Sequence, residues 1–121
     1  VEAIRQPDIG AVGLVGVRAH QDYAYSNSLK EMEDVQTVDS CFLLVDRRKG
    51  FRFDETTFDE LHLHVEDFCC QVRDAGLRCV VVPSKRFEHR SETWNVRGSC
   101  WGRYPEYKQR LRAKWGDVAT T

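Results

Sequence analysis

The chain has 121 residues, with 18 Lys and Arg against 19 Asp and Glu, and a formal net charge of −1 at pH 7. This length suits one domain, residues 1–121, and the balanced charge argues against a nucleic-acid partner, because nucleic-acid binders are usually basic. No run is long and apolar enough to span a bilayer and no signal-peptide pattern opens the chain, so we expect a cytoplasmic protein without a transmembrane segment.

The first half of the chain predicts a short helix and two strands. Residues 1–5 suit a helix that ends at a proline turn, and "IGAVGLVGVR" (9–18) suits a buried strand in which glycine permits close backbone approach. The polar residues 19–35 suit a surface loop, with room for a helical turn. "VQTVDSCFLLVDRR" (35–48) is rich in β-branched and apolar residues as far as Val45, which predicts the clearest strand.

The stretch "LHLHVEDFCCQVRDAG" (61–76) changes its period in the middle. His62 and His64 alternate with apolar residues, as in a strand. From Val65 to about Ala75 the apolar residues recur as on one face of a helix. Gly76 follows where a left-handed C-terminal cap is expected.

The last third predicts a strand, a loop and a helix. "LRCVVVP" (77–83) suits a short buried strand stopped by its proline, and the loop that follows is rich in histidine, tryptophan and glycine. "YPEYKQRLRAKWGD" (104–117) suits a basic helix with a proline near its first turn. Its buried stripe would comprise Tyr107, Leu111 and Trp115. Strands that alternate with helices indicate the α/β class.

Two carboxylates, Glu66 and Asp67, stand where the predicted helix begins. A carboxylate there is favoured by the unpaired N–H groups of the first turn and by the helix dipole, which gives a purely structural interpretation. A general base is the functional interpretation, because the carboxylate is held in a fixed direction where α/β sites usually lie. We expect one of the two to face the site and the other to face solvent or a cation.

Histidine and tryptophan supply the other candidate ligands. His62 and His64 have the i, i+2 spacing that places both on one face of a strand, and His89 or Glu66 would supply a third metal ligand. The alternative is a pair of half-buried polar residues beside a cleft. Trp94 suits either a stacking platform for a sugar or base, or a lid over the edge of the core.

The five cysteines form no CxxC pair, so a structural zinc site is not expected. We interpret them as mostly buried free thiols in a reducing compartment.

Several short motifs occur in a familiar order: "FDE" (53–55), "HLHVEDFCCQVRDAGLRCVVVP" (62–83), "FEHRSETW" (87–94) and the closing "YKQRLRAKWGD" (107–117). Together they resemble the C-terminal half of family-2 glycosyltransferases with the GT-A fold. The resemblance runs from about Pro7 to Asp117. It implies a partial GT-A-like mixed sheet flanked by helices.

The resemblance also implies roles for single residues. Asp67 matches the acid that acts as general base in inverting members, and Glu66 matches its acidic neighbour. His89 matches the histidine that completes a divalent-metal site, for Mn²⁺ or Mg²⁺, at the nucleotide diphosphate. Trp94 would lie on the acceptor side, and His62 and His64 would line the approach to the acceptor.

The donor half of the family's fold has no counterpart here. It carries an Asp-x-Asp metal motif, would end just before Val1, and no such motif occurs in the chain. We therefore expect a chain truncated from a larger domain or completed by dimerisation as a homo-oligomer. Its function would be inverting transfer from a nucleotide sugar to a carbohydrate acceptor. The alternatives are a non-catalytic binding or dimerisation module derived from such a transferase, and a small metal-binding protein that uses His62, His64 and His89.

Overall fold

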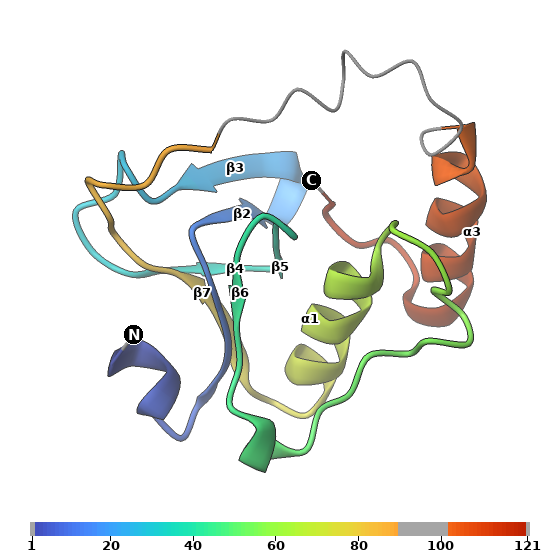
Figure 1. Cartoon of the computed structure of the whole chain (residues 1–121), viewed down its shortest axis with the longest axis horizontal. Coiled ribbons are helices and arrows are strands. Elements are labelled where there is room, and N and C mark those ends of the chain that lie inside the picture. Colours follow the sequence, from blue (N-terminus) through green and yellow to red (C-terminus); the bar gives the residue numbers. More distant parts are fainter. Residues whose placement is uncertain (1, 90–101, 121) are drawn as a thin grey trace.

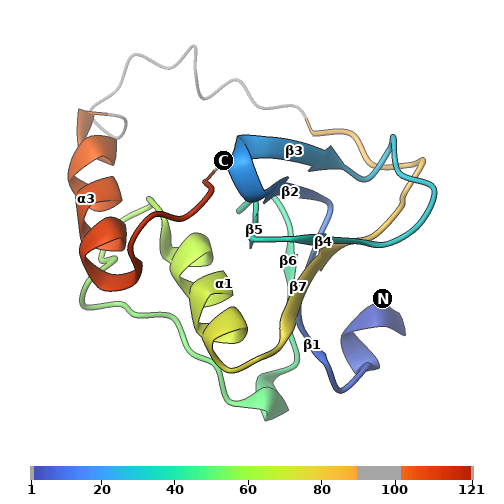
Figure 2. The ribbon, with the colours of Figure 1, turned by 180° about the vertical axis from the view of Figure 1, so that it is seen from behind.

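The structure, a computed structural model, describes residues 2–89 and 102–120. Two small β-sheets lie on one side of helix α1 (His64–Asp74), and helix α3 (Tyr104–Trp115) lies on its other side (Figures 1 and 2). The predicted α/β class is confirmed. No helix in these ranges is long and apolar enough to cross a membrane.

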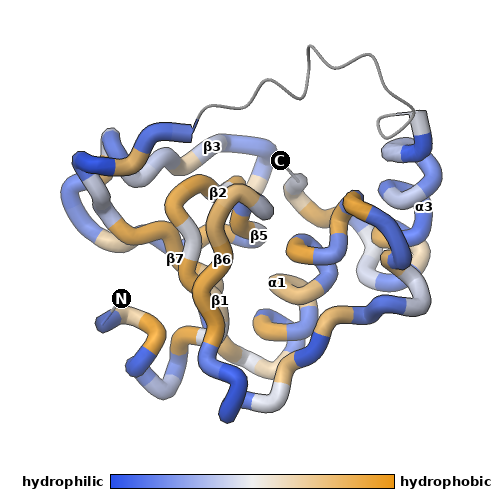
Figure 3. Tube along the Cα trace, in the orientation of Figure 1, coloured by the Kyte–Doolittle hydropathy of each residue, from blue (hydrophilic) through white to orange (hydrophobic). Residues whose placement is uncertain are grey.

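The first sheet is mixed, and its strand order is β4–β7–β1–β6. The strands are β1 (Ile9–Gly13), β4 (Glu33–Val35), β6 (Leu43–Leu44) and β7 (Arg78–Val81). β1 and β7 are parallel, whereas the β4–β7 and β1–β6 pairs are antiparallel. The central pair is mostly apolar in Figure 3, apart from Arg78 at the start of β7, as expected for parallel strands covered on both faces.

The second sheet is antiparallel, and its strand order is β3–β2–β5. It comprises β2 (Val15–Arg18), β3 (Asp22–Tyr25) and β5 (Thr37–Val38). The single strand predicted over residues 9–18 is therefore two strands in two sheets, which separate at Leu14.

Glycine lets the two sheets pack closely on either side of this break, as the glycines in the apolar run predicted. A Cβ atom at Gly13 in β1 would lie 2.6 Å from the Cβ of Val38 in β5, and one at Gly16 in β2 would lie 2.8 Å from a methyl carbon of Val81 in β7. Both distances are shorter than packed atoms allow. The two sheets thus approach each other at positions that a larger residue would hold apart.

Two predictions for the first half are wrong. The predicted surface loop at 19–35 has the expected helical turn, η2 (Ala19–Gln21), but also contains the strands β3 and β4, with Ala24, Leu29 and Val35 buried. Strands pair through backbone groups, so the polar side chains of these edge strands gave no sign of a strand in the sequence. The long strand predicted at 35–48 is reduced to β5 and β6, because a turn closed by the amide of Phe42 and the carbonyl of Asp39 separates them.

Helix α1 begins at His64 and ends as predicted. The residue before it, Leu63, has a left-handed backbone (φ 64°), so the strand predicted ahead of the helix is absent. At the other end Gly76 has φ 83°, and the Leu77 amide donates to the Val72 carbonyl across the cap (3.1 Å). This is the Schellman arrangement that a glycine after the helix predicts.

The chain end returns from α3 to the second sheet (Figures 1 and 2). The Thr37 hydroxyl donates to the carbonyl of Ala119 (2.7 Å), and the Ala119 amide donates to Gln36 (3.1 Å). Gln21 makes two hydrogen bonds to the backbone of Thr120, each 2.7 Å long. These bonds tie the segment after α3 to β5 and to the start of β3.

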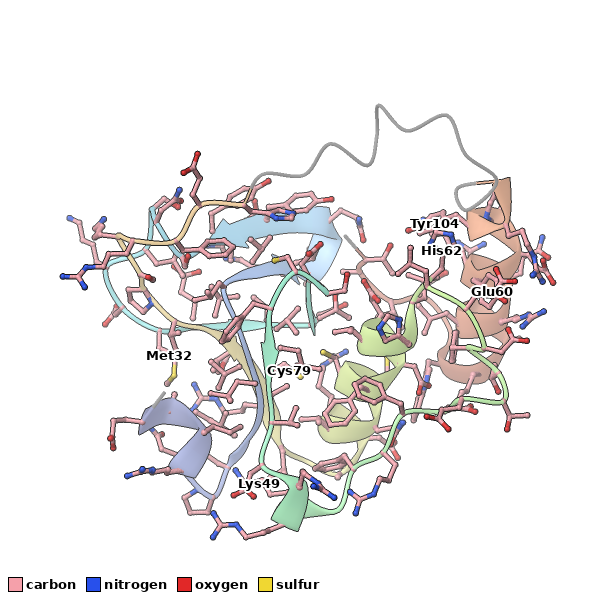
Figure 4. The ribbon with its side chains drawn as sticks, viewed as in Figure 1. Met32, Lys49, Glu60, His62, Cys79 and Tyr104 are labelled. Atoms are coloured by element: carbon pink, nitrogen blue, oxygen red, sulfur yellow. The ribbon has the colours of Figure 1, made fainter. Side chains whose placement is uncertain are left out.

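The amino-terminal 3₁₀ helix η1 (Glu2–Arg5), where a helix was predicted, is tied down by one lysine. The ammonium of Lys49 donates to the carbonyls of Ile4 and Gln6 (2.9 Å each) and to that of Ile9. In Figure 4 Lys49 lies below this helix, at the foot of the first sheet. Its contacts make this lysine structural.

Candidate functional site

The carboxylate of Asp67, in the first turn of α1, is fully buried and bound by three side chains. One oxygen, Oδ1, accepts from the indole N–H of Trp115 and from the ammonium of Lys114, both at 2.7 Å. The other, Oδ2, accepts from the amide of Gln71 at 2.9 Å. All three donors are side chains, and two of them come from the end of α3.

Lys114 joins Asp67 to a second carboxylate, that of Asp54, at 2.9 Å. Burial lowers the pKa of Lys114, but its hydrogen bonds to Asp67 and Asp54 outweigh burial and leave that pKa raised. The pKa of Asp54 is held well below its ordinary value, first by the backbone amide of Thr57 and then by Lys114. We call Asp54, Asp67, Gln71, Lys114 and Trp115 the Asp67 cluster.

Glu66, the neighbour of Asp67, is also buried. Neither acid faces solvent: Asp67 faces the cation of Lys114, and Glu66 is enclosed by protein as well. The α1 N-terminus lies inside the molecule, between the sheets and α3, so adjacent residues on different sides of the helix both meet protein.

A pocket of about 360 Å³ opens beside the start of α1. Its walls are the aromatic rings of Phe53 and Phe58 and the polar side chains of Glu55, Asp59, Glu60 and His64. The ammonium of Lys114 lies 5.9 Å from the centre of the Phe58 ring, so one side chain separates the pocket wall from Asp67. The pocket and the Asp67 cluster are thus neighbours.

The structure separates the two histidines predicted to share a strand face. His64 is the first residue of α1, lines the pocket and packs its ring against Phe53 at 5.7 Å. His62 is buried, with its ring 5.4 Å from that of Tyr104 and 5.9 Å from that of Tyr107. Figure 4 shows His62 beside Tyr104 at the top of α3. The prediction that His62 and His64 share a strand face is wrong, because α1 begins at His64 and no strand precedes it.

His89 meets two residues that the sequence analysis did not single out. It lies with Asp39 and Cys41 in a group whose potential ligand atoms are all within 4.8 Å of one another. In residues 2–89 and 102–120 no other group of three could hold a metal ion, so the trio of His62, His64 and His89 is wrong. We call Asp39, Cys41 and His89 the Asp39 cluster.

The turn after β5 holds two members of the Asp39 cluster. The amide of Cys41 donates to Oδ1 of Asp39 at 2.8 Å. Burial and, next, the hydrogen bond to Asp39 raise the pKa of the Cys41 thiol to about 12. Cys41, Cys69, Cys70 and Cys79 are free thiols, as expected for the described cysteines.

Trp94, the remaining predicted site residue, lies outside the described residues. Sequence reasoning missed Gln71, Lys114 and Trp115 as partners of Asp67, and it missed Asp39 and Cys41 as partners of His89. One signal was available: a tryptophan on a predicted buried stripe needs an acceptor for its N–H, although the pattern does not indicate an acid 48 residues away.

No protein-family model matches the chain, and neither a curated protein nor a solved structure matches it. The resemblance to family-2 glycosyltransferases therefore depends on the sequence motifs, and the site geometry has to support any function independently.

Proposed function

We propose that the chain is the acceptor-side half of an inverting glycosyltransferase, with Asp67 as the base that removes a proton from an acceptor hydroxyl. One observation carries this proposal: a buried carboxylate, held only by side-chain donors, stands next to a pocket that suits a sugar. Side-chain donors can be exchanged for a substrate hydroxyl, whereas backbone amides in a helix cannot.

The pocket has the composition that carbohydrate binding requires. The rings of Phe53 and Phe58 offer apolar faces for the C–H groups of a sugar, and Glu55 and Glu60 offer acceptors for its hydroxyls. An acceptor hydroxyl would take the place of the Trp115 N–H on Oδ1 of Asp67. Lys114 also pairs with Asp54, so Asp54 would still balance the lysine once Asp67 has accepted the proton and become neutral.

The donor in this proposal is a nucleotide-diphosphate sugar, and the residues that bind it are not assigned to this chain. Homo-oligomer formation likewise stays a prediction, as a way to complete the site. Glu66 is buried beside Asp67 and is a positioning residue in this scheme.

A second function is favoured by a different observation: Asp67 has no exposed surface and all three of its donors are in place. On that basis the carboxylate serves only to join α1 to α3. The chain would then be a non-catalytic α/β binding or dimerisation module derived from a transferase.

One experiment separates the two functions. The purified chain is melted with a panel of nucleotide-diphosphate sugars, with and without Mn²⁺, because a ligand that binds only the folded state raises the melting temperature. Any donor that binds is then incubated with a panel of sugar acceptors, and products are identified by mass spectrometry. The transferase proposal expects a donor-specific rise and a transfer product.

The variant Asp67→Asn tests the base, and Asp74→Asn, an exposed acid at the other end of α1, is its matched control. We expect Asp67→Asn to lower transfer at least about 100-fold, which is what loss of a general base costs, while donor binding is retained. Undiminished transfer by Asp67→Asn would refute the base. A cooperative melt that no donor shifts would favour the binding module.

A further inference from the structure

We infer that the Asp39 cluster is a binding site for Zn²⁺ or a similar thiophilic divalent ion, with Asp39, Cys41 and His89 as its three protein ligands. The resemblance implies Mn²⁺ or Mg²⁺ at His89. Those ions prefer oxygen ligands, whereas a set with one thiolate, one imidazole and one carboxylate suits zinc. The donor set therefore disagrees with the metal that the resemblance implies.

The spacing of the ligand atoms fits a tetrahedral ion. Zinc bonds of about 2.0–2.3 Å place tetrahedral ligand atoms about 3.3–3.8 Å apart. The donor atoms of Asp39, Cys41 and His89 already lie within 4.8 Å of one another. A contraction of at most about 1.5 Å would close the site.

Two of the ligands are held in position by the fold. Asp39 and Cys41 flank one residue in the turn after β5, and the Cys41 amide fixes Oδ1 of Asp39, which leaves Oδ2 for a metal. The strand before the turn is anchored on α1, because the Val38 amide donates to the Cys69 sulfur at 3.4 Å. This turn is therefore a rigid platform for one carboxylate and one thiol.

The third ligand arrives on a segment anchored to the end of β3. The Ser84 amide donates to the carbonyl of Ser26, and the Lys85 ammonium donates to that of Asn27, both at 3.0 Å. The His89 ring stacks on Phe87, with ring centres 6.3 Å apart. His89 is exposed, so its ring can move the short distance that coordination requires.

Charge supplies an independent argument. The ion pairs of the described residues leave Asp39 without a lysine or arginine partner, although the carboxylate is half-buried. Metal binding would release the proton of the Cys41 thiol, and the resulting thiolate and the Asp39 carboxylate would together carry the −2 charge that one divalent cation neutralises. Three protein ligands leave a fourth position for water or an anionic ligand, as in zinc sites that bind substrate.

Cobalt reports the proposed ligands directly and needs no enzymatic activity. The whole chain, freed of metal and kept reduced with a non-thiol reductant, is titrated with Co²⁺ while its absorption spectrum is recorded. We expect one Co²⁺ per chain, a thiolate-to-metal charge-transfer band, and displacement of Co²⁺ by one equivalent of Zn²⁺. Absence of the band, or binding of less than about one-tenth of an equivalent, would overturn the site.

Variants then identify the ligands. Cys41→Ser should abolish the charge-transfer band, and His89→Gln, at an exposed residue that folding does not need, should weaken Zn²⁺ binding at least about 100-fold. Matched controls are Cys70→Ser and His20→Asn, which should bind as the wild type does. A band that survives Cys41→Ser, or unchanged Zn²⁺ affinity in His89→Gln, would refute the assignment. These tests of the metal site do not depend on whether the chain transfers a sugar.

Discussion

The two carboxylates at the centre of the clusters, those of Asp67 and Asp39, differ in what surrounds them. Asp67 is fully buried and bound by a lysine, an indole and an amide. Asp39 is half-buried, accepts a backbone amide, and faces a thiol and an imidazole, with no described lysine or arginine at hand. One carboxylate is satisfied by the protein, and the other stands among potential metal ligands.

This difference leads us to expect that Asp67 affects the stability of the chain, whereas Asp39 affects metal binding. A buried charge that the protein itself neutralises contributes to folding, so removing its partner should destabilise the chain. A group of ligands without a protein cation contributes to folding only when an ion is added. The following predictions test that division, starting with the largest expected effect.

Lys114→Met should cause the largest loss of stability. It leaves Asp67 buried without its cation and also removes the partner of Asp54, so the free energy of unfolding should fall by about 3 kcal/mol. Chemical denaturation measures this value. The matched control is Lys108→Met on the same helix, a lysine without a described ion pair, which should change stability by less than about 0.5 kcal/mol.

The double variant Lys114→Met with Asp67→Leu sharpens this test. Removal of both charges leaves no fully buried carboxylate without a cation, and Asp54 keeps the backbone amide of Thr57, so part of the lost stability should return although the Trp115 N–H loses its acceptor. A double variant that is less stable than Lys114→Met alone would show that Asp67 contributes through contacts other than its charge.

Trp115→Phe should have a smaller effect. The ring remains apolar, but Asp67 loses one charge-assisted hydrogen bond while keeping Lys114 and Gln71, so we expect a loss of about 1.5 kcal/mol. Equilibrium unfolding followed by circular dichroism gives the value. Equal stability of variant and wild type would mean that water replaces the indole, and hence that the carboxylate is more accessible than its burial indicates.

Acid should weaken the Asp67 cluster through Asp54. Its pKa in the folded chain lies below the ordinary value, so its stabilising contribution is complete above the unfolded pKa and is lost as pH falls towards the folded one. The melting temperature should therefore decrease as the pH is lowered below about 5, and the decrease should be less steep in Asp54→Asn. A parallel decline in both proteins would contradict this role for Asp54.

Local patterns in the sequence predicted the helices well. The periodic apolar residues of α1 and α3, and the glycine that caps α1, depend on interactions within a few residues. The same is true of β7, whose consecutive apolar residues are buried together. The general α/β class follows from these elements and is confirmed.

The strands of the first half were predicted poorly because their pairing is not local. β3 and β4 are polar edge strands held by backbone bonds to β2 and β7. The partners of Asp67 were missed for the same reason. Asp67 was found from its place at a helix start, but Lys114 and Trp115 are more than forty residues away and reach it only after α3 packs. The GT-A likeness stays a prediction.

Asp39→Asn should have the smallest effect on the metal-free chain. The Asn oxygen can still accept the Cys41 amide, and no cation loses a partner, so stability should change by less than about 0.5 kcal/mol. With Zn²⁺ at about 100 times its dissociation constant, the wild type should gain about 2.7 kcal/mol, and the variant should gain much less at the same concentration. Denaturation with and without Zn²⁺ measures both values. A variant destabilised as strongly as Lys114→Met would place Asp39 with Asp67 as a structural carboxylate, because only a charge that the fold already uses is costly to remove without metal.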